Sequence, residues 1–78
     1  MSANRNILET VIHGYLITSV YRFSENEGVV IAHNVKAASP YVAWNYRIDN
    51  DTLNCFWGHY CDTAEQAHNE YSEKIRNR

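Results

Sequence analysis

The chain is poor in the residues that cross-link or interrupt a fold. Its 78 residues include two cysteines, one proline and three glycines. Two cysteines are too few for the disulfide framework of a small secreted scaffold. The sequence also has no internal repeat and no low-complexity segment. One small domain over residues 1–78 is therefore expected, of a size that is marginally stable alone because it buries only about 60% of its unfolded surface.

Long hydrophobic runs are missing as well. No stretch approaches the roughly 20 apolar residues that span a bilayer. Residues 2–6 are polar, and the apolar core of a signal peptide does not follow them. These two observations predict a cytoplasmic protein with no membrane partner.

The sequence lacks an excess of basic charge. Its formal net charge is −2, and its seven Lys and Arg residues are scattered except near the C-terminus. Nucleic-acid binding through phosphate neutralisation needs a basic surface. The charge therefore disfavours a nucleic-acid partner.

What the chain does have is apolar and aromatic content, at 45% and 13% of its residues. β-Branched and aromatic residues predict a first hairpin, with strands over residues 15–24 and 29–35 and a turn that ends at Gly28. Pairing around this turn places Phe23 opposite Val29 and Tyr21 opposite Ile31. The same register places Ile17 opposite Val35, on the same face.

A second hairpin is predicted over residues 40–60, which hold both tryptophans. With the turn centred on Asn50 and Asp51, Trp44 lies opposite Trp57, and a one-residue slip would mix apolar and polar faces. The two should be cross-strand neighbours in the core, so Trp57→Ala should cost about 3–5 kcal/mol. One face is then Val42, Trp44, Tyr46, Ile48, Leu53, Cys55 and Trp57, and the other is Ala43, Asn45, Arg47, Asn54, Phe56, Gly58 and Tyr60.

The two ends of the chain predict helices. Asp62 or Thr63 is a suitable N-cap for a C-terminal helix with a narrow apolar stripe, Ala64, Ala67, His68, Tyr71 and Ile75. Residues 6–13 favour a short helix by their apolar spacing, although their β-branched composition also suits a strand. The fold class is thus α+β: a four-stranded antiparallel meander with a C-terminal helix packed on one face, preceded by this short N-terminal element.

The chemistry-bearing residues form no recognisable catalytic, cofactor or metal site. Cys55, His59, Cys61 and His68 have spacings unlike those of a zinc finger or ribbon. On a straight strand, Cys55 and Cys61 would lie roughly 20 Å apart, too far for one metal ion or a disulfide bond. His59 and Cys61 would be about 6–7 Å apart, beyond hydrogen-bond reach. We expect no enzyme, no cofactor and no metal.

Two surface features remain. The hairpin turns should gather Glu25, Glu27, Asp49 and Asp51 at one end of the sheet, which is either a site for a basic partner or an ordinary pair of solvated turns. The aromatic residues exceed what one narrow helix can cover, so they form either a thin core or a protein-binding patch. The candidate interaction residues are Tyr41, Arg47, Phe56 and Tyr60.

The function that follows is a non-enzymatic protein-interaction module. Its partner is expected to be another protein or complex, with a homodimer as the simplest case. An adaptor or an inhibitor of a larger complex fits the size and charge, for example a phage- or plasmid-borne inhibitor of a host defence system. The alternative is a regulator that binds a small molecule or a metal through His33, His59 and the aromatic face.

Overall fold

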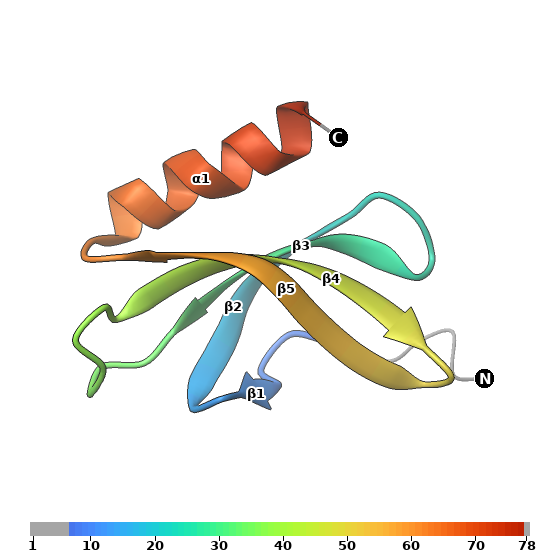
Figure 1. Cartoon of the computed structure of the whole chain (residues 1–78), viewed down its shortest axis with the longest axis horizontal. Coiled ribbons are helices and arrows are strands. Elements are labelled where there is room, and N and C mark those ends of the chain that lie inside the picture. Colours follow the sequence, from blue (N-terminus) through green and yellow to red (C-terminus); the bar gives the residue numbers. More distant parts are fainter. Residues whose placement is uncertain (1–6, 78) are drawn as a thin grey trace.

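A computed structural model describes residues 7–77, which form one antiparallel sheet and one helix (Figure 1). The strands are β1 (Val11–Ile12), β2 (Tyr15–Arg22), β3 (Glu27–His33), β4 (Tyr41–Asp49) and β5 (Thr52–Cys61), followed by the helix α1 (Ala64–Arg76). The strand order is β1-β2-β3-β4-β5, so each strand pairs with its neighbour in the chain. The predicted α+β class, antiparallel meander and C-terminal helix are confirmed, but the sheet has five strands rather than four.

The predicted N-terminal helix is wrong within the described residues 7–13, and Asn6 lies outside them. Val11 and Ile12 form β1 and pair with Leu16 and Tyr15. The turn between these strands places His13 and Gly14 at φ 53° and 85°, which is the left-handed geometry of a tight hairpin. A helix this short is marginal in water, and pairing satisfies the backbone groups instead.

The first hairpin is closed by a tighter turn than predicted. The amides of Phe23 and Ser24 both donate to the carbonyl of Glu27, at 2.8 and 3.2 Å. Gly28 therefore lies within β3, and Tyr21 pairs with Val29 rather than with Ile31.

A bulge interrupts the β2–β3 ladder. The register shifts between Ile17 and Ser19, so that Ile17 pairs with Ala32 and not with Val35. Because an extra residue moves the following side chains to the other face, Ile17 joins the face opposite to that of Tyr21. The predicted single face for Ile17 and Tyr21 is therefore wrong.

The second hairpin follows the predicted register from its turn as far as Asn45, which pairs with Phe56. A second bulge then shifts the register by one residue, so that Ala43 pairs with His59 and Val42 with Tyr60. The predicted Trp44–Trp57 and Val42–His59 pairs are wrong for this reason. Tyr60 moves to the face of Val42, away from Arg47 and Phe56.

The bulge is explained by the contact between Trp44 and Gly58. A Cβ atom on Gly58 would lie 2.6 Å from two atoms of the Trp44 indole, so the ring lies directly against the glycine backbone. Trp44 is 3% exposed, whereas Trp57, in the bulge, is 74% exposed. The prediction that both tryptophans share the core is therefore wrong for Trp57.

The larger core cluster lies on the sheet face away from α1. It contains the buried residues Ile7, Tyr15, Ile17, Val30, Ala32, Val42, Trp44 and Tyr46. The rings of Tyr15 on β2 and Tyr60 on β5 lie 5.7 Å apart, although three strand spacings would separate these strands by about 14 Å in a flat sheet. The sheet therefore curls around this cluster.

The helix covers the other face through a smaller cluster of Ile31, Cys61 and Ala67, with Tyr41 and Tyr71 beside it. The helix therefore does not cover the face of Trp44, which is filled instead by Ile7 and residues of β1 and β2. Ala67 is fully buried, so its small side chain lets α1 approach the sheet closely.

The predicted N-cap of α1 is confirmed at Thr63. Its Oγ1 accepts a hydrogen bond from the amide of Gln66 at 3.1 Å, and Gln66 Oε1 accepts one from the amide of Asp62 at 3.0 Å. These bonds satisfy two backbone donors at the start of the helix. Within residues 7–77, no helix combines the length and the apolar character required to cross a bilayer.

Candidate interaction site at the β5 bulge and the adjoining cleft

A cleft of ≈ 790 Å³ lies between the C-terminal half of α1 and the sheet beneath it. The topology explains its position, because α1 starts beside the end of β5 and returns over β4 and β3. Its walls combine aromatic and charged side chains. The lining residues are Phe23, Glu27, Gly28, Asn45, Tyr46, Arg47, Phe56, Trp57, His59, Glu70, Glu73, Lys74 and Asn77.

Trp57 is the most unusual residue at this cleft. Its backbone has φ 54°, in the left-handed region that a bulky side chain rarely adopts. Such a conformation costs about 1–2 kcal/mol for an L-residue. Its ring meets that of Phe56 edge-to-face at 5.0 Å, yet 74% of the residue is exposed. A strained backbone thus presents a large aromatic group to solvent.

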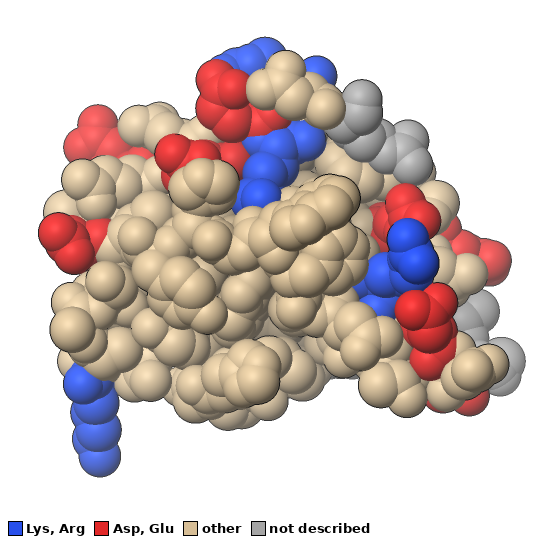
Figure 2. All heavy atoms as spheres, in the orientation of Figure 1, with Lys and Arg blue, Asp and Glu red and all other residues tan. Residues whose placement is uncertain are grey.

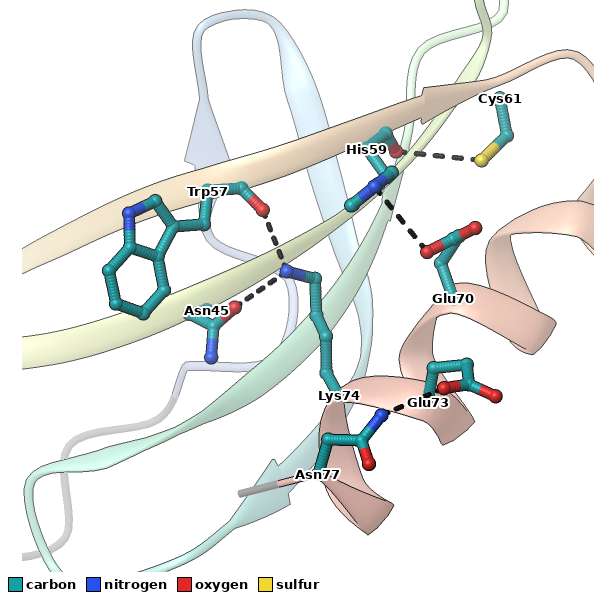
Figure 3. Close-up of polar contacts among 8 residues, drawn as sticks. All are labelled: Asn45, Trp57, His59, Cys61, Glu70, Glu73, Lys74 and Asn77. Carbon is teal, nitrogen blue, oxygen red and sulfur yellow. Dashed lines mark hydrogen bonds and ion pairs between the residues drawn. The ribbon is translucent and has the colours of Figure 1, made fainter.

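Lys74 holds the bulge in place from the helix. Its Nζ donates hydrogen bonds to Asn45 Oδ1 and to the carbonyl oxygen of Trp57, each at 2.7 Å (Figure 3). Burial lowers the pKa of Lys74, and the nearby Glu70 carboxylate opposes that shift. One ammonium group therefore ties α1 to both β4 and β5.

Two further side-chain pairs at the cleft are exposed. His59 Nε2 lies 3.6 Å from Glu70 Oε1, and Arg47 Nε lies 3.8 Å from Glu27 Oε2. Exposed pairs of this kind contribute about 0–1 kcal/mol. They shape the rim of the cleft more than they stabilise the fold.

Glu73 belongs to a pair at the end of α1. It accepts hydrogen bonds from Arg76 at 2.6 Å and from Asn77 Nδ2 at 2.8 Å. The Arg76 hydrogen bond and positive charge, followed by the Asn77 bond, lower the pKa of the Glu73 carboxyl. Its charge is thus already partnered within the helix.

The four interaction residues predicted from sequence are separated in space. Arg47 and Phe56 line the cleft. Tyr60 is on the opposite face, where its ring contacts those of Tyr15 and Trp44 at 5.7 and 6.2 Å. Tyr41 stacks on His33 at 4.4 Å, in the cluster beneath the first half of α1.

Sequence reasoning missed Trp57 and Lys74 as members of this site. Gly58 carried a usable signal, because a glycine inside a strand pattern often marks a bulge or a close backbone approach. Applied to β5, that rule predicts a bulge at Gly58, so that Trp57 is no longer paired with Trp44 and points outward. No comparable signal identified Lys74, whose role depends on where α1 crosses the sheet.

The cysteines lie in separate environments on the two faces. Cys55 packs against the larger cluster, whereas Cys61 belongs to the helix cluster. Burial raises the pKa of the Cys55 thiol to about 11. Burial also raises the pKa of Cys61, with further contributions from the negative charges of Glu70 and Asp62. Both thiols are therefore protonated near neutral pH, the unreactive form of cysteine.

The remaining polar candidates form no metal-binding group within residues 7–77, where no three His, Cys, Asp or Glu side chains are placed to hold one ion. The two acidic turns do lie at the same end, as predicted. The amide of Ile48 donates to the carbonyl of Asn26 at 2.8 Å and joins the ends of the two hairpins. Asn77 and Lys74 line the cleft together with Glu27, so the end of the helix returns to this end of the sheet with basic charge.

Replacing Trp57 by glycine should raise the free energy of unfolding relative to Trp57→Ala. Glycine adopts φ 54° without the Cβ penalty, whereas alanine keeps it. We expect the glycine variant to be more stable than the alanine variant by about 1 kcal/mol in urea unfolding. Equal stability of the two variants would contradict a left-handed backbone at this position.

No protein-family model matches the sequence, no curated protein matches it, and no solved structure matches the fold.

Proposed function

We propose that this protein is a non-enzymatic protein-interaction module whose contact surface centres on Trp57. The observation that carries the proposal is a tryptophan that is 74% exposed on a strained bulge. Strained backbone often persists at functional sites, where the surrounding structure holds it in place. Tryptophan is also enriched among the residues that dominate protein–protein binding.

The surface around Trp57 supports a protein partner. Figure 2 shows charged groups over α1 and at the right-hand end of this view, with a broad uncharged surface between them. Residues 52–61, which form β5, include no Lys, Arg, Asp or Glu. The Phe56 ring, 5.0 Å from that of Trp57, adds a second aromatic group. Depletion of charge at the centre with a polar rim is typical of interface cores.

The biological role that fits is an adaptor or an inhibitor of a larger complex in the cytoplasm. A phage- or plasmid-borne inhibitor of a host defence system is one example of this class. The support is physical: a small chain of net charge −2 whose most distinctive feature is an exposed aromatic surface. The partner is another protein, and a second copy of the chain is included among the candidates.

The test is affinity capture in the native host, followed by mass spectrometry. We expect the wild-type chain to retain a specific protein, and Trp57→Ala to lose it. A hot-spot loss of about 2 kcal/mol corresponds to roughly 30-fold weaker binding. Val35→Ala is the matched control, because Val35 is 75% exposed in the connection between β3 and β4. A monomeric wild type that captures no specific partner would overturn the proposal.

A second candidate function is small-molecule binding in the cleft. Its volume of ≈ 790 Å³ lies within the range of roughly 300–1,000 Å³ that is usual for ligand sites. Asn45, His59 and Lys74 place polar groups on its walls beside the aromatic side chains of Phe56 and Trp57.

The two functions predict different perturbations in a two-dimensional NMR spectrum. A small ligand should shift the signals of Asn45, Lys74 and their neighbours in the cleft, without dependence on protein concentration. A protein partner should broaden the signals along the length of β5. The sequence suggested, as an alternative, a regulator that binds a small molecule or a metal. The cleft, which His59 lines, supports the small-molecule version of that hypothesis.

A further inference from the structure

We infer that the free edge of β5 pairs with the β5 edge of a second copy, in an antiparallel arrangement around a two-fold axis. The inference rests on the proposed protein-interaction function and names the partner and the backbone that it contacts. In the described part of the chain, β5 is hydrogen-bonded to β4 and lies at the end of the strand order. Figure 1 shows β5 along the front of the sheet, with α1 above it.

The two edges of the sheet are unequal. β1, at one edge, has 2 residues, whereas β5, at the other, has 10. A short edge strand is one of the ways in which proteins avoid unwanted pairing. The long β5 edge, by contrast, offers backbone donors and acceptors to a further strand on either side of Trp57, whose carbonyl already accepts a hydrogen bond from Lys74.

Two common protections are missing from β5. Residues 52–61 contain no proline and no Lys, Arg, Asp or Glu, although charged side chains usually guard an exposed edge. β4, which is covered on both sides by other strands, carries Arg47 and Asp49. Charged side chains therefore occur on the interior strand β4 and are absent from the edge strand β5.

The bulge at Trp57 and Gly58 is a feature of β5 that does hinder edge-to-edge pairing. It limits how much of the strand can pair with a second copy. It shifts the register of the strand and divides β5 into residues 52–56 and 58–61. Pairing with a second copy therefore uses one of these segments, and the exposed Trp57 lies beside either one.

A second copy fits this edge better than a foreign strand. Antiparallel pairing around a two-fold axis is self-complementary, because each donor of one copy meets an acceptor of the other. An uncharged strand meets no like charge when it faces itself. A foreign partner is usually selected by complementary charge, and β5 offers none.

The difference between the two edges of the sheet also limits the size of the oligomer. Once two β5 edges are paired, the edge that remains on each copy is the two-residue β1 and the part of β2 that β1 does not cover. β1 is too short to recruit further copies efficiently, and the exposed Arg22 at the end of β2 is an edge-guarding charge. The expected product is a dimer with one continuous sheet, rather than a filament.

Sedimentation velocity over a range of concentrations tests the inference on the full chain. We expect the wild type to shift from monomer to dimer as its concentration rises. Trp57→Lys adds an edge-guarding charge and should weaken dimerisation at least tenfold. Val35→Lys adds the same charge at a site of 75% exposure, against 74% for Trp57, and should dimerise like the wild type. Circular dichroism checks that both variants are folded.

Hydrogen exchange of the β5 amides locates the contact independently of any substitution. We expect amides of one segment of β5, residues 52–56 or residues 58–61, to become better protected as the dimer forms, with no change in β1. A monomeric wild type, or a dimer that Trp57→Lys leaves intact, would overturn the inference. Capture of a host protein that Trp57→Ala abolishes, by a chain that stays monomeric, would overturn the dimer and leave the proposed function standing.

Discussion

Trp44→Ala should cause a large loss of stability in this domain. Trp44 is 3% exposed and lies against the backbone of Gly58 and the rings of Tyr15 and Tyr60. Truncation of a buried tryptophan costs about 3–5 kcal/mol, because it removes apolar contacts and leaves a cavity. A chain of 78 residues has a free energy of unfolding of roughly 4–12 kcal/mol, so this loss takes at least about a quarter of it.

Urea unfolding monitored by circular dichroism measures this effect, and Trp57→Ala is its control. Trp57 is 74% exposed, so its truncation should change stability by no more than about 0.5 kcal/mol. This replaces the loss of about 3–5 kcal/mol that the sequence alone predicted for Trp57. Equal destabilisation by the two substitutions would show that the bulge does not separate the tryptophans.

Gly28→Ala should be the most disruptive small substitution in the chain. A Cβ atom at this position would collide with the carbonyl oxygen of Tyr21 on the adjacent strand and lie 2.6 Å from the ring of Tyr46. The oxygen belongs to the sheet backbone, so β2 and β3 would have to move apart. Overpacking of this kind costs about 1–3 kcal/mol or more, and we expect the upper part of that range.

The matched comparison is Gly58→Ala, measured by thermal unfolding. The added Cβ atom would meet atoms of Trp44 and Tyr60, which belong to side chains and can rotate. We expect Gly58→Ala to lower the melting temperature less than Gly28→Ala does. The reverse order would mean that the Trp44 ring is held more rigidly than the β2–β3 ladder.

Predictions from the sequence were correct where the structure depends on residues that are close together in the chain. The capping residues around Thr63 predicted the start of α1, and the polar turn at Asn50 and Asp51 predicted the first five pairs of the β4–β5 ladder. Both depend on residues close together in the chain. The alternation of apolar side chains along β4 likewise predicted that Val42, Trp44 and Tyr46 share the core.

The predictions failed where a distant contact decided the outcome. The bulge at Trp57 depends on Trp44 lying against Gly58, and that contact joins two strands. The side covered by α1 depends on how Ile7 and the first two strands fill the opposite face. Both errors affected the predicted interaction site. Arg47 and Phe56 do lie together, but Tyr60, which was predicted on their face, lies on the other one.

The strand order also bears on how the chain reaches its fold. Each ladder joins strands that are consecutive in sequence, so every pairing step closes a short loop at low entropic cost. Pairing between strands that are close in sequence favours faster folding than pairing between distant ones. The contact between Tyr15 and Tyr60 is different, because it joins the first full-length strand to the last. The curl of the sheet therefore depends on the ladders being in register. A hairpin with a slipped register would lose the contact between the Tyr15 and Tyr60 rings and would be less stable.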